Sequence, residues 1–350
     1  VLGQAFLALA EDGAGELMGP RGAWWLDRLE GELDNFRAAL DWMAARDPAC
    51  ALRLGAALWR VWQMRGHLHE GRTRLEALIA ASADADAALR ARGFEALGGL
   101  AYWQADMPAA RAAYERVLDL ERELGDGERV AEALYNLAFT YQLGVEDVQA
   151  SDIGRTMSLL GQALELYREA HADLGAAKCL WAMSTNTYDG AVARLERGEA
   201  DEAREDFVRA LGYGTESLEV FRRHGDWFGT GWALHAVGMS LVRLDRLAEA
   251  REAFIEGLDV FVEHRDISGV MLLLDDIAAR AARAGQGDDA LRIRGGAERL
   301  RHDTGTDLAR LVNAHDGRFE AADLDERQGA LWREGAALSM EELIALARSL

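Results

Sequence analysis

Proline and lysine are scarce in this chain of 350 residues, which has three prolines and a single lysine, Lys178. So few prolines allow long uninterrupted helices, and the abundant alanine, leucine, arginine and glutamate favour them. The alternating valine, isoleucine and threonine pattern of a sheet is also absent. The sequence therefore predicts an all-α protein, and its length favours an array whose core grows by repetition.

Cysteine and long apolar runs are equally limited. The two cysteines, Cys50 and Cys179, lie far apart in helical patterns, which excludes a disulfide framework and is typical of reduced, buried thiols. No apolar run reaches the roughly 18 residues that a membrane span needs, and no signal peptide is visible. We expect a cytoplasmic protein without membrane contact. Because the first residue is Val1 and opens directly into a helical pattern, we expect a fragment of a larger protein.

Positive charge is in deficit, and the net charge is −21. Such a surface repels phosphates, so direct binding to nucleic acid is not expected. The chain contains no G-x-x-x-x-G-K-[ST], G-x-S-x-G, H-E-x-x-H or C-x-x-C motif, and Lys178 has no glycine-rich loop before it. We therefore predict no enzymatic activity and no cofactor, although an enzyme with unfamiliar site residues stays an alternative.

Small residues recur in a pattern that indicates helical hairpins. An alanine is followed four positions later by an aromatic residue in three segments, as Ala110 with Tyr114, Ala203 with Phe207 and Ala250 with Phe254. The helix before such a segment carries its own small residue, such as Gly98 or Gly238, which permits close approach. This is a tetratricopeptide-like pattern, and it predicts a right-handed superhelix of helical hairpins.

Turn residues divide the chain into segments. Gly125-Asp126-Gly127 and Gly285-Gln286-Gly287 fall where one helix should end and the next begin. An irregular stretch at 144–154 is expected to form a loop that lengthens the third hairpin. The predicted organisation is connecting helices at 1–47, an array of about six hairpins at 48–300 and a helical cap at 301–350.

Two end segments carry more specific patterns. In ELDNFRAALDWM (32–43), apolar residues at spacings of three or four predict a buried stripe with Trp42 at its margin; they are Leu33, Phe36, Ala39, Leu40 and Met43. Near the end of the chain, Ser339 and Glu342 have the spacing of a capping box. Both patterns indicate packing and helix capping rather than catalysis.

The same end segments resemble the C-terminal half of large bacterial ATP-binding transcription regulators. These are signal-transduction ATPases with numerous domains, or STAND proteins, and some are classed with LuxR-type or antibiotic-regulator ATPases. The matching residues of the first segment are Glu32, Asp34, Asn35, Arg37, Ala38, Ala39, Leu40 and Trp42; GGAERLRHDTG (295–305) and LWREGAALSMEELIALA (331–347) resemble the closing segment. The resemblance implies a sensor arm that binds an inducer or partner and controls an ATPase domain of the same full-length protein.

Other polar clusters have simpler interpretations. His67, His69 and Glu70 could supply metal ligands, but a solvated turn is favoured because no second ligand pair lies nearby. Asp275 and Asp276 point about 100° apart on a helix, so a solvated face is favoured over an acid–base pair. No metal site is predicted.

The first helices of tetratricopeptide-like hairpins line a concave groove, and counting from the small residues places particular side chains there. Aromatic rings supply contact area and polar groups orient a ligand, so this set is the candidate site for a protein, a peptide or a small-molecule inducer. Its members are Arg60, Gln63, Glu95, Tyr102, Trp103, Tyr135, Phe139, Gln142, Thr185, Asn186, Tyr188, Asp189, Trp232, His235, Met239 and Asp275.

One part of this set, the polar run 183–189, is unusual in the middle of a helix. Serine, threonine and asparagine compete with the backbone for hydrogen bonds, so something must favour them there. Two interpretations remain open. The segment either faces a ligand through Thr185, Asn186, Tyr188 and Asp189, or it is a kinked or frayed helix end.

The candidate function is accordingly a non-catalytic sensor and interaction domain of a bacterial ATPase regulator. The alternative is a stand-alone peptide-pheromone receptor or protein scaffold.

Overall fold

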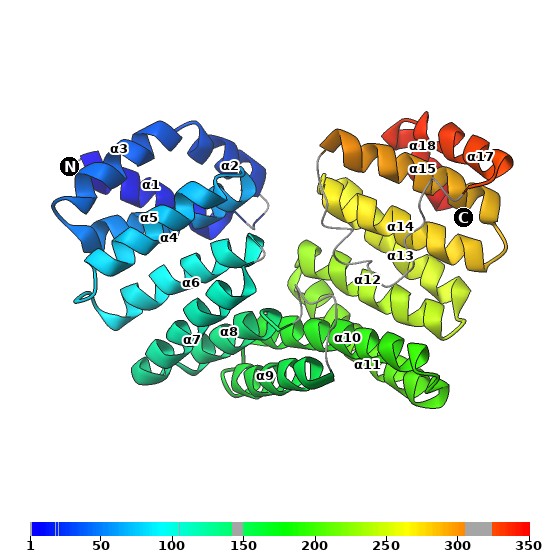
Figure 1. The fold of residues 1–350 in the computed structure, drawn as a ribbon, viewed down its shortest axis with the longest axis horizontal. Helices are drawn as coiled ribbons and strands as arrows, with labels where there is room; N and C mark the ends of the chain where they lie inside the picture. Colours follow the sequence, from blue (N-terminus) through cyan, green and yellow to red (C-terminus); the bar gives the residue numbers. More distant parts are fainter. Residues whose placement is uncertain (1, 18, 20, 105, 142–149, 305–323) are drawn as a thin grey trace. The chain divides into compact units, whose positions relative to one another are not determined.

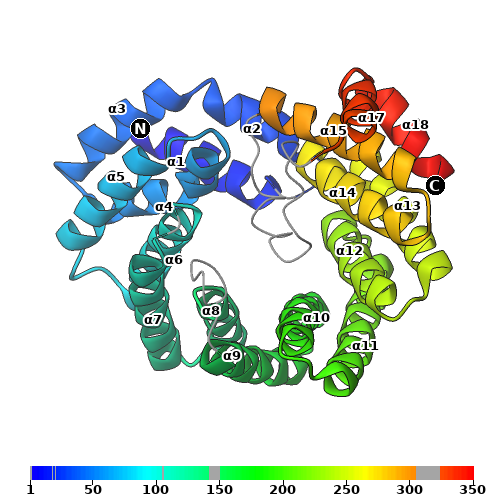
Figure 2. The same cartoon turned by 45° about the vertical axis from the view of Figure 1, so that its right-hand side comes forward.

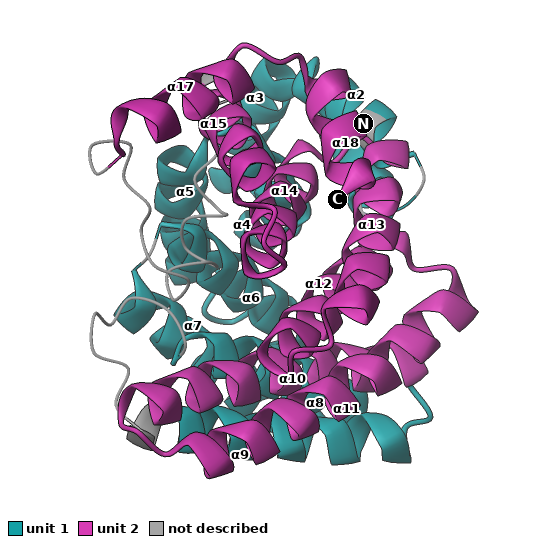
Figure 3. Ribbon diagram, turned by 90° about the vertical axis from the view of Figure 1, so that its right-hand side faces the viewer, with its two compact units in different colours: residues 1–172 teal, residues 173–350 magenta. Residues whose placement is uncertain are grey.

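A computed structural model describes residues 2–17, 19, 21–104, 106–141, 150–304 and 324–350, and these form helices and no strand. The predicted all-α class is therefore confirmed. The chain divides into two compact units, residues 1–172 and 173–350 (Figure 3). The division lies inside the stretch 48–300 that was predicted as one array, and the outer boundaries near 47 and 300 remain predictions.

The first unit is built from three N-terminal helices followed by three helical hairpins (Figure 1). Its helices are α1 (Leu2–Glu16), α2 (Gly22–Glu30), α3 (Leu33–Ala44), α4 (Pro48–Met64), α5 (Leu68–Ala81), α6 (Ala87–Trp103), α7 (Met107–Leu124), α8 (Gly127–Phe139) and α9 (Ala150–Glu169). Residues 150–154, predicted as part of a loop, begin α9 instead, and the rest of that predicted loop up to residue 149 lies outside the described residues.

The second unit contains three further hairpins and a terminal helix pair. Its helices are α10 (Asp173–Glu196), α11 (Ala200–His224), α12 (Trp227–Arg243), α13 (Leu247–Glu263), α14 (Ile267–Arg283), α15 (Gly287–Thr304), α17 (Glu326–Ala336) and α18 (Met340–Ser349). The predicted capping box is confirmed at the start of α18. Glu342 N donates to Ser339 Oγ at 3.2 Å, and Ser339 N donates to the Glu342 carboxylate at 2.8 Å.

Small residues allow the two helices of a hairpin to approach closely, as predicted. A Cβ atom added to Gly98 on α6 would lie 2.9 Å from the Tyr114 ring on α7. One added to Gly238 on α12 would lie 2.2 Å from the Phe254 ring on α13. Distances this short are clashes, so each glycine makes room for the aromatic residue that follows an alanine in the partner helix.

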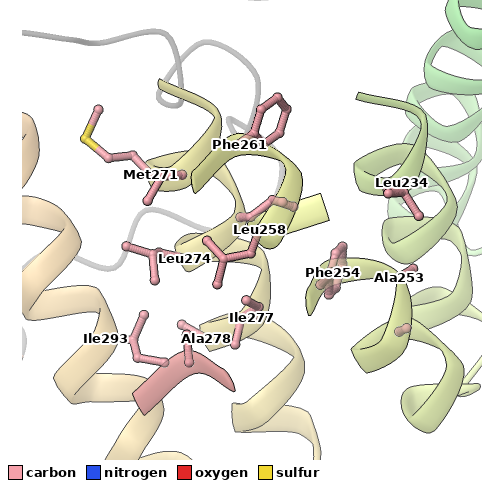
Figure 4. Packing of buried hydrophobic residues seen from close by; sticks show 14 of the residues in the cluster. Leu234, Ala253, Phe254, Leu258, Phe261, Met271, Leu274, Ile277, Ala278 and Ile293 are labelled. Atoms are coloured by element: carbon pink, nitrogen blue, oxygen red, sulfur yellow. The ribbon is translucent and has the colours of Figure 1, made fainter. Parts of the chain in front are cut away.

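Aromatic and aliphatic side chains from successive hairpins form the core of the second unit. Phe254, Leu258 and Phe261 of α13 pack with Leu274 and Ile277 of α14, as Figure 4 shows. Phe254 and Leu258 are essentially inaccessible to water. Each such side chain contributes about 1.5–3 kcal/mol by burial, so this continuous core holds the hairpins in register.

Helix ends follow the turn chemistry of the sequence. Asp126 caps α8 by accepting a hydrogen bond from Arg129 N, and Asp226 caps α12 through Gly229 N. Gly125 ends α7 with φ of 76°, a left-handed conformation that costs glycine little. These short turns place α8 and α12 as the first helices of their hairpins.

The stripe predicted in α3 is confirmed, since all five of its predicted apolar residues are buried. Arg37 of α3 donates from Nε and NH2 to the two carboxylate oxygens of Glu70 on α5, at 2.8 and 2.6 Å. The segment that carries the family resemblance therefore packs into the unit. Glu70 also accepts from Arg74, so the turn residue predicted to be solvated is an ion-pair member.

No helix within the described ranges is long and apolar enough to span a membrane.

Candidate functional site

The predicted site residues of the first unit lie on α4, α6 and α8, the first helices of its three hairpins. Figure 2 shows these helices along one side of the unit, with α5, α7 and α9 along the other. Residues three, four or seven positions apart share a helix face. The aligned pairs are Arg60 with Gln63 on α4, Glu95 with Tyr102 on α6, and Tyr135 with Phe139 on α8.

Aromatic rings connect α6 to α8. The Tyr102 and Phe139 rings lie edge to face with centroids 6.4 Å apart, and Phe139 meets Tyr135 at 5.0 Å. Trp103 lies 6.2 Å from Tyr102 and remains 41% exposed. Burial raises the pKa of the Tyr102 hydroxyl, so this ring stays neutral. The structure therefore brings four predicted site residues together in an aromatic cluster with one exposed member.

Arg60 lies beside this aromatic cluster, and its positive charge is not paired with a negative charge of the described residues. Its guanidinium stacks on the Trp59 ring at 4.0 Å. Burial lowers its pKa, against the weaker opposing effects of nearby Tyr114 and Glu95. Among the described residues, Arg60 forms neither a hydrogen bond nor an ion pair. A cation withdrawn from water without a paired anion destabilises the structure, and an acceptor from outside would relieve this cost.

The carboxylates near Arg60 have other partners. Glu95 pairs with Arg129 of α8 at 2.6 Å, and Arg129 also pairs with Glu121 of α7 at 3.2 Å. Glu132 accepts a hydrogen bond from the Tyr167 hydroxyl. Burial lowers the pKa of Arg129, but Glu95 and Glu121 outweigh it and raise that pKa above the ordinary value. Arg129 thus cross-links the hairpins, whereas Arg60 does not.

Gln63, one turn after Arg60, has a buried side-chain oxygen that accepts no hydrogen bond from the described residues. An unsatisfied buried acceptor costs about 1–3 kcal/mol. Arg60 and Gln63 therefore present a donor group and an acceptor group side by side without internal partners. Gln142, predicted to join them, lies outside the described residues.

The polar run of α10 has internal partners. Ser184 Oγ donates to the Ala210 carbonyl of α11 at 2.7 Å, and Asn186 Nδ2 donates to the Ala182 carbonyl at 2.7 Å. Thr185 Oγ1 also donates to Ala182, at 3.0 Å. The helix runs through this segment without interruption, so it is not a frayed or broken end.

Tyr188 is likewise part of the packing. It is 4% exposed, its ring lies 5.3 Å from Phe207, and its hydroxyl accepts from Arg243 Nε at 2.9 Å. Asn186 is 3% exposed. Packing therefore explains these two residues, and ligand contact stays a prediction for half-buried Thr185 and Asp189.

The remaining predicted residues lie on α12 and α14. His235 is 1% exposed, and its Nδ1 lies 2.6 Å from the Asp276 carboxylate on α14. Trp232 packs edge to face on Trp181 and Phe261, and Met239 is half-buried against the core. The predicted solvated face at Asp275 and Asp276 is wrong for Asp276, which lies in the core.

Asp275 is also largely withdrawn from water. Burial raises its pKa to about 6, against the opposing effect of Arg301 on α15. Arg301 NH1 donates to the Asp275 carboxylate at 2.5 Å. The pairing arginines Arg129, Arg243 and Arg301 were all missed from the sequence. Each lies 26–55 residues from its partner, so no local signal marks it.

No family model and no curated protein matches this sequence. Solved structures match most of it at low identity. A Rap protein complexed with competence and sporulation factor aligns with a TM-score of 0.63 and 16% identity, covering 99% of this chain and 89% of that chain. The apo form of RapI gives 0.56 and 14%, covering 96% and 85%.

Aspartyl phosphate phosphatase F from Bacillus subtilis gives a TM-score of 0.52 and 13% identity, covering 99% of this chain and 82% of that chain. At such identities, the likeness shows a shared fold of tetratricopeptide-like helical repeats and nothing about chemistry. The sequence prediction of the repeat class is thereby confirmed.

Proposed function

We propose that this chain is a non-catalytic binding module that takes a peptide, or a short segment of a partner protein, on the α4, α6 and α8 face of its first unit. The observation that carries the proposal is the combination of Arg60 and Gln63, which lack partners among the described residues, with the aromatic cluster of α6 and α8. Partly buried rings supply apolar contact, and the polar pair orients a ligand.

A further observation supports a binding function. The Rap protein that aligns over most of this chain was solved with competence and sporulation factor bound. A repeat fold of this kind is therefore compatible with capture of a signalling molecule.

The proposal is tested with a pool of random, acetylated hexapeptides. The protein is incubated with the pool and separated by size exclusion, and retained peptides are identified by mass spectrometry. We expect selective enrichment by the native protein and weaker enrichment by Trp103→Ala. Trp42→Ala is the control, since Trp42 is also exposed but lies on α3. Retention of no peptide, or equal loss in both variants, contradicts the proposal.

We further propose that the module is the sensor arm of a bacterial STAND-type transcription regulator. The support is the resemblance of residues 32–43, 295–305 and 331–347 to that family. In this mechanism, the ligand binds one arrangement of the arm better than another and so shifts the ATPase between states. Calorimetry of the isolated chain should show no ATP binding; tight, magnesium-dependent binding would contradict this assignment.

A stand-alone receptor is the second candidate, and the structural comparison favours it equally. The Rap protein that aligns over 89% of its length with this chain was solved in complex with competence and sporulation factor, which supports a receptor as well as a regulator. Sequencing the gene upstream of residue 1 separates the two candidates. A P-loop in the same reading frame supports the regulator, and a start codon adjacent to residue 1 supports the receptor.

A further inference from the structure

Arg60 is a half-buried arginine of the first unit that has no carboxylate partner among the described residues, unlike three others. Arg37 pairs with Glu70 and Asp34, Arg72 with Glu76 and Asp106, and Arg129 with Glu95 and Glu121. In each case a second helix or turn supplies an acid at the guanidinium. Among the described residues no acid takes this place at Arg60, so its donors remain available.

Arg60 and Gln63 are also complementary to each other as a recognition pair. An arginine donates hydrogen bonds in a planar fork that matches a carboxylate, and the buried Gln63 oxygen, which has no partner among the described residues, can accept from an N–H group that reaches it. Residues three apart on a helix have Cβ atoms about 5–6 Å apart. The amide N–H and the carboxylate of a peptide's last residue are attached to the same Cα atom, so two side chains that reach in from neighbouring positions can contact both groups.

We propose that Arg60 and Gln63 form a subsite for the free C-terminus of a peptide, with Arg60 binding the carboxylate and Gln63 accepting from the amide of the last residue. This deepens the binding function proposed above and rests on it. Tyr135 of the aromatic cluster interacts electrostatically with Arg60, and the cluster favours an apolar last side chain.

The charges around the subsite restrict the rest of the peptide. Glu95, Glu121 and Glu132 surround Arg60 and Arg129, and the whole chain carries a net charge of −21. The C-terminal carboxylate of the peptide is stabilised by direct contact with Arg60. Acidic side chains elsewhere in the peptide would instead be repelled by the glutamates of the protein. The ligand is therefore a peptide with a free C-terminus, an apolar last residue and no acidic side chains.

The test uses three acetylated random hexapeptide pools. The first lacks aspartate and glutamate and has a free C-terminal acid. The second has the same composition and a C-terminal amide. The third is amidated but contains glutamate, so it offers a carboxylate only from side chains. Retention of each pool is measured by size exclusion and mass spectrometry at pH 7.

Native protein should retain the acid pool at least tenfold better than either amidated pool. Arg60→Met should reduce this preference to about twofold or less, and Gln63→Glu should reduce it because it adds a carboxylate beside the bound one. Arg46→Met is the matched control. Arg46 also stacks on a tryptophan, at 4.6 Å from the Trp42 ring, but it is exposed in the turn after α3.

Equal retention of the acid and amidated pools overturns the subsite while leaving the binding function intact. A preference for the glutamate pool also overturns it and indicates a side-chain carboxylate as ligand. An acid preference that persists in Arg60→Met assigns the carboxylate to another residue and overturns the role of Arg60. Retention of none of the pools overturns the proposed function itself. Thermal unfolding of each variant shows whether it is folded.

Discussion

The first-helix faces of the two units carry similar residue types but differ in how their titratable groups are paired, although Trp232 Nε1 of the second unit is buried without a hydrogen-bond partner among the described residues. In the second unit, His235 meets Asp276, Asp275 meets Arg301, and Tyr188 meets Arg243. In the first unit, Arg60 and the Gln63 oxygen have no such partner among the described residues. A polar side chain on a first helix therefore indicates a ligand site only where no side chain of the neighbouring hairpin forms a hydrogen bond or an ion pair with it.

The largest effect should come from breaking the buried pair of the second unit. His235→Ala leaves the Asp276 carboxylate in the core without the imidazole, so the free energy of unfolding should fall by about 3–5 kcal/mol. Chemical denaturation followed by circular dichroism measures this loss. His69→Ala, at an exposed position, should cost less than about 0.5 kcal/mol. An equal loss in the free energy of unfolding for the two variants would show that His235 does not stabilise the fold.

Two arginines of the first unit give a direct contrast. Arg129→Met leaves Glu95 and Glu121 without their shared cation and should destabilise the protein by about 2–4 kcal/mol. Arg60→Met removes a cation that has no ion-pair partner among the described residues, so stability should change by less than about 1 kcal/mol or rise. The same denaturation measurement compares them. A loss at Arg60 as large as that at Arg129 would mean that Arg60 serves the fold.

Asp275 provides a pH-dependent effect. Burial raises its pKa to about 6 in the folded protein, above the usual value of 3.8. Between these two pH values, the folded state therefore holds a proton on Asp275 that the unfolded state has lost. Its contribution to stability is therefore favourable below about pH 4 and is lost as the pH rises through 6. Relative to Asp275→Asn, the native protein should lose up to about 3 kcal/mol between pH 4 and pH 7.

The measurement is the difference in unfolding free energy between the native protein and Asp275→Asn at each pH, which cancels the other titrating groups. A difference that does not vary with pH would show that Arg301 keeps the carboxylate ionised throughout.

The smallest effect concerns Tyr188. Tyr188→Phe removes only the hydroxyl that accepts from Arg243, so stability should fall by about 1–2 kcal/mol, while the ring still packs on Phe207. Peptide retention should be unchanged. Lost retention with intact stability would restore Tyr188 as a ligand contact.

Much of the fold follows from local sequence. The buried stripe of α3, the Ser339 capping box and the small residues Gly98 and Gly238 were all predictable, because each depends on spacings within one helix or on one turn. The aromatic cluster of the first unit was predictable for the same reason. Rings at fixed positions of first helices converge once the hairpins stack.

The hydrogen-bond and ion-pair partners of buried polar side chains could not be predicted in this way. Asp276 is read from the sequence as solvated, yet its partner His235 lies 41 residues away on another first helix. The polar run 183–189 could be read from the sequence as ligand-facing or as a kinked or frayed helix end, yet bonds to the carbonyls of Ala182 and Ala210 satisfy Ser184, Thr185 and Asn186. Such pairings depend on the register between hairpins, which a single sequence does not reveal.

Hydrogen–deuterium exchange with and without an enriched peptide tests the central claim most directly, because it reports where on the chain the ligand acts. The account predicts slower exchange in α4, α6 and α8, centred on residues 58–64, 95–103 and 132–139, and no comparable change in α12 or α14. Protection confined to α12 and α14, with the first unit unchanged, would contradict it.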